Sequence, residues 1–167
     1  AAAIDRNRAA PHVPFSAAAG GDTTYYCVVD AEGNTVSAIQ SINSAFGSGV
    51  TAGDTGILLN NSLGNLAWGR GGPDSKATQP VPGKRVGSTI TPMIVFKDDK
   101  PWLVTGTPGG GYIIATMVQL LSNVMDHGLN VSEAAERPRI NQGGGDAALE
   151  LEEGFSPDIV PLLEAKG

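Results

Sequence analysis

The stretch that most constrains the fold is residues 20–30, where a glycine-rich acidic lead runs into Thr23 and a series of aromatic and β-branched residues. Such residues favour extended strands. Residues 31–34 supply Gly and Asn for a tight turn, and residues 35–43 return with alternating apolar and polar side chains. The pattern predicts an antiparallel hairpin, in which pairing places the early forties opposite the low twenties. We therefore expect Ser41 to lie beside Thr23.

Thr23 combines two groups that hydrolytic chemistry can use if the chain is cut after Asp22. A threonine hydroxyl is a poor nucleophile at neutral pH, and an adjacent base activates it. A free α-amine, whose pKa is about 8, can be that base without any histidine. Scission fits the same chemistry, because the Thr23 hydroxyl can attack the Asp22 carbonyl and leave an ester for water to open. The alternative is an ordinary strand threonine with no chemical role.

The composition indicates a folded chain and argues against two kinds of partner. Of the 167 residues, 41% are hydrophobic and 17% are charged, whereas disordered chains usually have the opposite balance. The net charge of -6 is spread along the chain and the Lys and Arg residues never cluster, which argues against nucleic-acid binding. No apolar run approaches the ~20 residues of a transmembrane helix, so we expect no membrane segment in this chain.

The single cysteine is expected to be a packing residue, and the two histidines are not expected to bind a metal. Cys27 alternates with aromatic and apolar residues in the predicted strand, which favours a small buried thiol over a reactive one. His12 lies in the poorly patterned beginning of the chain, and His127 lies at a predicted helix end. Neither has a second His, Cys or carboxylate at metal-ligand spacing, so we assign no metal and no cofactor.

The rest of the pattern predicts strands first, then helices, then a further strand and a final short helix. Residues 1–22 lack a hydrophobic period and read as a linker or tail. A glycine-rich turn at 108–111 opens the strongest helical pattern, 112–127, where apolar residues recur at helical spacing. The other expected elements are a strand at 56–59, a long loop at 60–83, a hairpin of 89–96 with 102–105, a helix at 132–137 capped by Ser132, a strand at 149–151 and a helix at 156–164. This order indicates a layered α/β (α+β) fold rather than alternating βαβ units.

Several sequence blocks, in a fixed order, resemble the small subunit of the γ-glutamyltranspeptidases. They are Thr23-Thr24, residues 41–49 (SINSAFGSG), 56–61 (GILLNN), 87–92 (GSTITP), 107–110 (TPGG) and 154–158 (GFSPD). The resemblance implies an N-terminal-nucleophile (Ntn) hydrolase with a four-layer αββα sandwich, completed by a large subunit of the same precursor. It makes residues 1–22 the tail before an autocleavage site and residues 23–167 the small-subunit region. Because family members continue past the equivalent of Gly167, it also implies truncation at the C-terminus.

The resemblance also assigns catalytic roles. Thr23, freed by cleavage of the bond after Asp22, would be the nucleophile and its own base. Ser41, normally a threonine in the family, would hydrogen-bond that nucleophile. The N–H groups of Gly109 and Gly110 would form the oxyanion hole, since glycine permits close approach and the unpaired N–H groups at a helix start carry positive potential.

Five further residues match substrate-binding positions of the family. Asn43 would help to hold the α-carboxylate or α-amine end of a γ-glutamyl group, and Ser88 and Thr89 would bind the carboxylate. Ser62 and Asn65 stand where the family has Gln or Glu and then an Asp that pairs with the substrate ammonium. Because a charge-assisted hydrogen bond is about twice as strong as a neutral one, Asn65 should weaken the preference for a free α-amine.

The sequence therefore predicts an N-terminal threonine amidohydrolase or acyltransferase that acts on γ-glutamyl amides such as glutathione. A glutaryl- or cephalosporin-type acylase of the same family is the first alternative, and an unprocessed, inactive precursor is the second. A periplasmic or extracellular location is suggested by the resemblance.

Overall fold

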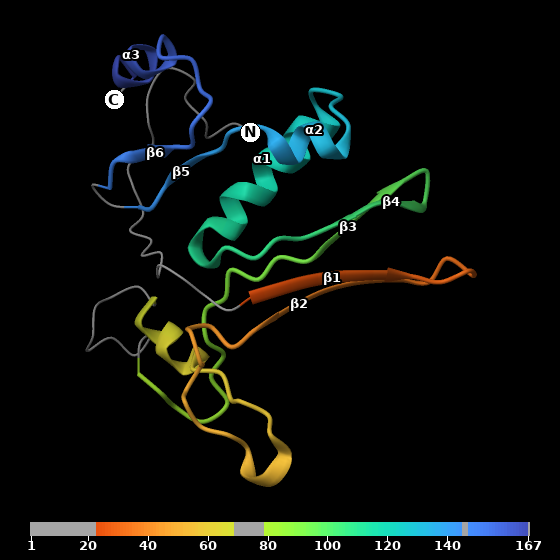
Figure 1. Cartoon of the computed structure of the whole chain (residues 1–167), viewed down its shortest axis with the longest axis vertical. Coiled ribbons are helices and arrows are strands. Elements are labelled where there is room, and N and C mark those ends of the chain that lie inside the picture. The colour runs from red at the N-terminus through yellow and green to blue at the C-terminus, as the bar shows by residue number, and fades with distance from the viewer. Residues whose placement is uncertain (1–22, 69–78, 145–146, 167) are drawn as a thin grey trace. The chain divides into compact units, whose positions relative to one another are not determined.

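The computed structural model describes residues 23–68, 79–144 and 147–166. The chain divides into two compact units, of which the described parts lie within residues 23–117 and 118–166 (Figure 1). The division falls within helix α1 (Ile113–Met125). Within the described ranges, the strands pair as three two-stranded antiparallel sheets.

The first unit begins with the hairpin that the sequence predicts, formed by β1 (Thr23–Val29) and β2 (Thr35–Ser41). The register pairs Thr23 with Ser41 at the open end of the hairpin. In the turn, Gly33 has a φ of 86°, a left-handed conformation that glycine adopts without a steric penalty. The alternating pattern and the turn therefore fix both the pairing and its register.

The outer half of β1 is exposed, and the expected burial of Cys27 is wrong. Its neighbour Val28 is 57% exposed, so an apolar residue type alone does not place a side chain in a core here. The alternation in the sequence indicates a strand whose face needs a cover, but it does not show which segment or chain provides that cover.

A second predicted hairpin joins β3 (Met93–Lys97) to β4 (Lys100–Thr105). The turn residues Asp98 and Asp99 have φ of 52° and 58°, as a tight hairpin turn with two left-handed residues requires. The first strand begins at Met93 rather than at residue 89. Pro92 gives a physical reason, because proline has no N–H for a ladder hydrogen bond.

The two hairpins meet where β1 and β2 pass the end of β4. The Ser37 hydroxyl donates to the Thr105 carbonyl at 3.4 Å, and the Tyr25 and Ser37 hydroxyl oxygens are 3.3 Å apart. The Tyr25 ring lies directly against Gly106, where a methyl group would overlap it. Burial raises the pKa of Tyr25, and the hydrogen bond with Ser37 partly offsets this rise.

The chain that follows the first hairpin does not contain the predicted strand at 56–59. Thr51 and Leu58 form only an isolated bridge around a 3₁₀ turn at Gly53–Thr55. Among the described residues, the apolar run pairs only through this bridge, so the prediction of a strand from its apolar composition is wrong.

The predicted loop at 60–83 is also partly wrong, because it contains a 3₁₀ helix at Ser62–Trp68. Asn65 and Leu66 within it are buried. A helix of two 3₁₀ turns is too short to leave a hydrophobic period in the sequence. Residues 69–78 of that loop lie outside the described ranges.

A 3₁₀ turn at Gly110–Tyr112 leads into α1, the predicted strong helix. Ile113 and Met117, one helical turn apart, are 1% and 0% exposed. They are the largest fully buried side chains of the described residues and mark the core of the first unit. This core anchors the helix that follows the glycine-rich turn.

The second unit contains α2 (Val131–Glu136), whose cap differs from the prediction. Asn130, not Ser132, is the N-cap. Its side chain accepts from the Glu133 N–H at 2.9 Å, and the Glu133 carboxylate accepts from the Asn130 N–H at 3.2 Å. This reciprocal pair is a capping box.

The second unit ends with β5 (Ile140–Gln142), β6 (Leu149–Leu151) and α3 (Ile159–Glu164). β6 is predicted, whereas β5 is not, and α3 starts three residues later than expected. The Gln119 side chain of α1 holds β5 by donating to and accepting from the backbone of Ile140 at 2.8 and 2.9 Å. Among the described helices, none has the length and apolar character needed to cross a membrane.

Candidate active site

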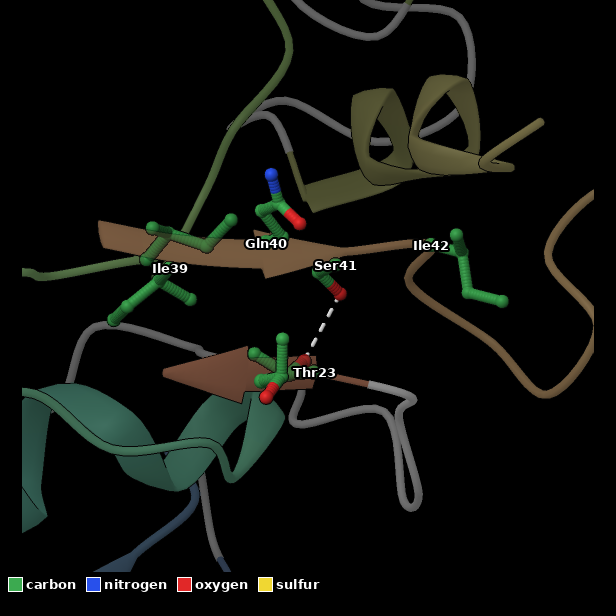
Figure 2. A pocket seen from close by; sticks show the side chains of 7 residues that line it. Thr23, Ile39, Gln40, Ser41 and Ile42 are labelled. Atoms are coloured by element: carbon green, nitrogen blue, oxygen red, sulfur yellow. Dashed lines mark hydrogen bonds between the residues drawn. The ribbon is translucent and has the colours of Figure 1, made fainter. Parts of the chain in front are cut away.

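Thr23 and Ser41 meet at the open end of the first hairpin. Their hydroxyl oxygens are 2.9 Å apart and share a hydrogen bond that either can donate (Figure 2). Both residues are half-buried and line an open pocket of about 830 Å³. The other lining residues are Thr24, Ile39, Gln40, Ile42 and Ile90. The predicted proximity of the two hydroxyls is confirmed, and the pocket has the size of a small-molecule site.

The Ser41 oxygen also accepts a hydrogen bond of 2.9 Å from the backbone N–H of Asn43. Asn43 has a φ of 77°, and its side-chain amide donates to Asn61 Oδ1 at 3.0 Å. Asn61 in turn accepts from the Ser44 N–H at 3.1 Å and donates to the Ser44 hydroxyl at 3.0 Å. The structure thus brings Asn43 next to Ser41 and adds Asn61, which the sequence placed in a matching block but gave no role.

Ser62 and Asn65 lie on the 3₁₀ helix. The Ser62 N–H donates to the Asn60 side chain at 2.9 Å. Asn65 is only 8% exposed, and its Nδ2 donates to the Gly87 carbonyl at 3.1 Å. That bond fixes the orientation of a neutral, buried amide and joins the 3₁₀ helix to the segment that carries Ser88 and Thr89.

Ser88 and Thr89 are neighbours in the chain but lie in different environments. Ser88 is exposed, and its oxygen accepts from the Ile90 N–H at 3.2 Å. Thr89 is 6% exposed, and its hydroxyl donates to the Gly110 carbonyl at 2.7 Å. The next residue, Ile90, lines the pocket of Thr23. This short segment therefore connects the pocket with the glycine turn.

The glycine turn has backbone angles that few other residues adopt. Gly109 has a φ of 141° and Gly110 a φ of 56°. Gly109 is exposed and Gly110 half-buried, so ligand access is greatest at the first of the two. The turn ends where the Tyr112 N–H donates to the Gly109 carbonyl at 3.0 Å. N–H groups at such a helix start can stabilise a negative charge.

The described residues that line the pocket are neutral, with hydroxyl, amide and apolar side chains. In the described ranges, no group of three or more His, Cys, Asp or Glu side chains is placed to hold a metal ion. His127 is exposed just beyond the end of α1. Asp22 and the predicted cleavage junction lie outside the described residues.

Comparison with known proteins identifies relatives over the whole chain. The family model described as gamma-glutamyltranspeptidase matches residues 1–167. The glutathione hydrolase proenzyme of Escherichia coli (strain K12) is 42% identical over 180 residues, which cover 98% of this chain and 30% of that protein. The acylase ACY 1 proenzyme of Pseudomonas sp. (strain V22) is 37% identical over 153 residues, covering 92% of this chain and 26% of that protein. The chain thus spans less than a third of the length of these relatives.

Solved structures agree with the sequence comparison. The Helicobacter pylori gamma-glutamyltranspeptidase T380A mutant matches with a TM-score of 0.77 and 35% identity, over 86% of this chain and 81% of that chain. An acivicin-inhibited gamma-glutamyltranspeptidase matches with a TM-score of 0.77 and 36% identity, over 86% and 80%. The predicted fold class, the small-subunit part of an α+β Ntn-hydrolase sandwich, is confirmed. The chain belongs to the γ-glutamyltranspeptidase family.

Proposed function

We propose that this chain carries the nucleophile of an N-terminal threonine amidohydrolase and acyltransferase. It would cleave γ-glutamyl amides such as glutathione through an acyl-enzyme, after autocleavage of a precursor between Asp22 and Thr23. The observation that carries the proposal is the 2.9 Å contact between Thr23 Oγ1 and Ser41 Oγ at the wall of a pocket. A relative that is 42% identical is named a glutathione hydrolase proenzyme, which supports the substrate class.

The proposed reaction uses the two functional groups of one residue. The freed α-amine of Thr23 takes the proton from Oγ1 as that oxygen attacks the amide carbonyl. Ser41 already accepts from the Asn43 N–H, so it can donate its own hydrogen to Thr23 Oγ1 and stabilise the charge that develops there. The N–H groups of Gly109 and Gly110 would stabilise the oxyanion. The amine of the substrate takes this proton and leaves. Water or a second amine then attacks the acyl-enzyme ester and releases Thr23.

The acyl end of the substrate would be held by Asn43, Ser62, Asn65 and Ser88. Asn43 and Ser88 each offer a polar group near the hairpin end and the pocket segment. Asn65 presents a buried neutral amide, whereas a carboxylate at this position would face the Gly87 carbonyl. A neutral amide binds an ammonium group more weakly than a carboxylate does.

Asn65 is also the observation that favours a second candidate function, a glutaryl- or cephalosporin-type acylase. A substrate without an α-amine loses little when the site lacks a carboxylate partner for that amine. A relative that is 37% identical is named an acylase proenzyme, which supports the same alternative. The third reading, an unprocessed and inactive precursor, requires that the bond before Thr23 stays intact.

We propose that the partner of this chain is the large subunit of the same precursor. Large apolar side chains are exposed on several elements, including Phe46 at 77%, Val118 at 60% and Val28 at 57%. Such exposure supports an interface with another polypeptide. The names of the relatives, which are proenzymes, support processing of one precursor. The resemblance favours a periplasmic or extracellular location.

Two measurements on the complete protein test the proposal. Mass spectrometry should find a new N-terminus at Thr23, and the Thr23→Ala variant should stay uncut. Hydrolysis rates of γ-glutamyl and glutaryl anilides should then differ, with the γ-glutamyl compound turned over faster. Faster turnover of the glutaryl compound would establish the acylase instead. An intact bond before Thr23 together with no turnover of either anilide would leave the precursor reading.

A further inference from the structure

The Thr89 hydroxyl is committed to the glycine turn. It donates to the Gly110 carbonyl at 2.7 Å, and the same carbonyl accepts from the Ile113 N–H at the start of α1. A threonine hydroxyl has one hydrogen to donate. A side chain that is 6% exposed and spends that hydrogen on Gly110 cannot also donate it to a substrate carboxylate.

The preceding carbonyls of the same turn are held as well. The Thr107 hydroxyl donates to the Pro108 carbonyl at 2.8 Å. The Tyr112 N–H donates to the Gly109 carbonyl at 3.0 Å. Three consecutive carbonyl groups, of residues 108 to 110, therefore each accept a hydrogen bond.

Holding a carbonyl also holds the next N–H group. The peptide unit is planar and trans, so the C=O of one residue points opposite to the N–H of the next. The bond to Pro108 O thus orients the Gly109 N–H, and the bond to Gly109 O orients the Gly110 N–H. The bond from Thr89 fixes the following peptide unit, which sets where the turn enters α1. Glycines have little intrinsic preference for one orientation, so these bonds supply it.

We propose that Thr89 and Thr107 are positioning residues that hold the peptide units of the glycine turn in one orientation. The inference rests on the proposed function, in which the N–H groups of Gly109 and Gly110 stabilise an oxyanion. It changes the predicted role of Thr89, which would act on the turn and not on the substrate. Ser88 alone would then serve as the hydroxyl donor to the carboxylate, since it is exposed and uses its oxygen only as an acceptor within the described residues.

The test uses isosteric variants of the complete, processed protein. Thr89→Val and Thr107→Val remove the hydroxyl and keep the shape, whereas Thr89→Ser keeps the hydroxyl. Thr55→Val is the matched control, because Thr55 also donates to a backbone carbonyl, that of Ala52, at 2.6 Å. For each variant, kcat and KM are measured with the preferred anilide. Affinity is measured for two ligands. One is the parent acid, which is the carboxylic acid that hydrolysis of the anilide releases, and the other is the boronic acid in which boron replaces the reacting carbonyl carbon.

Both valine variants should lose about 10- to 100-fold in kcat, the size of effect expected when a reacting group is misplaced by a fraction of an ångström to 1 Å. Their affinity for the boronic acid should fall by a similar factor, because its tetrahedral adduct carries an oxygen at the oxyanion position. KM and the affinity for the parent acid should stay within about twofold. Thr89→Ser and Thr55→Val should resemble the wild type.

Two results would overturn the inference. In the first, Thr89→Val raises KM and weakens binding of the parent acid with kcat preserved, the result expected of Ser88→Ala, so that Thr89 binds the carboxylate after all. In the second, both valine variants keep full kcat. Should Thr89→Val fail to fold, Thr107→Val decides by the same criteria. A wild-type protein that turns over neither anilide refutes the proposed function itself, which is a different outcome from an active wild type with unaffected variants.

Discussion

Replacing Gly106 by alanine should force the Tyr25 ring away from the end of β4. The new methyl group would overlap Cδ2 of the ring and lie 2.6 Å from Cε2, about 1 Å closer than two carbon atoms pack. The φ of Gly106 lies outside the left-handed region, and the three atoms nearest to the new methyl group all belong to the Tyr25 ring, so the collision with that ring is the main steric cost. Overpacking of this kind costs about 1–3 kcal/mol of unfolding free energy. Tyr25 lies two residues after Thr23, so the displacement should also reach the proposed nucleophile.

The assay is thermal unfolding combined with anilide turnover, on Gly106→Ala, Tyr25→Val and the double variant. The single glycine variant should unfold on the order of 5 °C lower. Tyr25→Val removes the ring that collides, so the double variant should be more stable than the sum of the two changes predicts, by about 1–3 kcal/mol. Gly143→Ala is the matched control, because its methyl group would lie 3.8 Å from Ala147 Cβ, the nearest atom among the described residues. Strictly additive effects would refute the reasoning, since the ring would then not be what excludes the methyl.

Three further changes follow from single contacts. Asn130→Ala removes the side-chain oxygen that accepts from the Glu133 N–H but keeps the backbone N–H that donates to the Glu133 carboxylate. Losing this side-chain half of the capping box should cost about 1 kcal/mol in urea unfolding; an unchanged midpoint would show that the Asn130 side chain contributes nothing. Hydrogen bonds from Arg139 lower the pKa of Glu152. The Glu152 carboxylate therefore stabilises the fold above about pH 4.3, the ordinary value for a Glu carboxyl, and this stabilisation is lost as the pH falls through the lowered pKa. The stability gap between wild type and Glu152→Gln should therefore shrink on acidification, and a gap that persists at pH 2 would contradict this. Asn61→Ala frees the Asn43 amide and should raise KM several-fold more than it lowers kcat, and the reverse split would contradict a binding role for Asn43.

The parts of the fold that the sequence predicts well are those with a long local signal. The β1–β2 hairpin has seven paired residues in each strand, an alternating pattern and a glycine turn, so its register and the meeting of Thr23 with Ser41 could be predicted. Helix α1 has thirteen residues and a clear helical period. Both signals lie within a continuous stretch of chain, where periodicity and turn chemistry determine the structure.

The missed parts depend on partners far along the chain. β5 is three residues long and is held by the Gln119 side chain from 21 positions earlier, which no local period can indicate. Thr89 and Gly110 are also 21 positions apart, so the donor role of that hydroxyl could not be predicted from its place beside Ser88. The predicted burial of Cys27 is wrong for a related reason, because the sequence shows an apolar strand face but not what covers it.

The described lining of the pocket contains no base, so the proposed catalysis depends on cleavage of the precursor. The described lining residues offer hydroxyl, amide and apolar groups, and none of them is a base that could take the proton from Thr23 Oγ1 at neutral pH. In the proposed mechanism, the base is instead the α-amine, which exists only after the bond before Thr23 is cut. The Ser41 hydroxyl can stabilise charge on Oγ1 but cannot replace that amine, since a hydroxyl is a weak base. Scission would therefore create the catalytic base, so an uncut chain with its pocket and its Thr23–Ser41 contact in place should still be inactive.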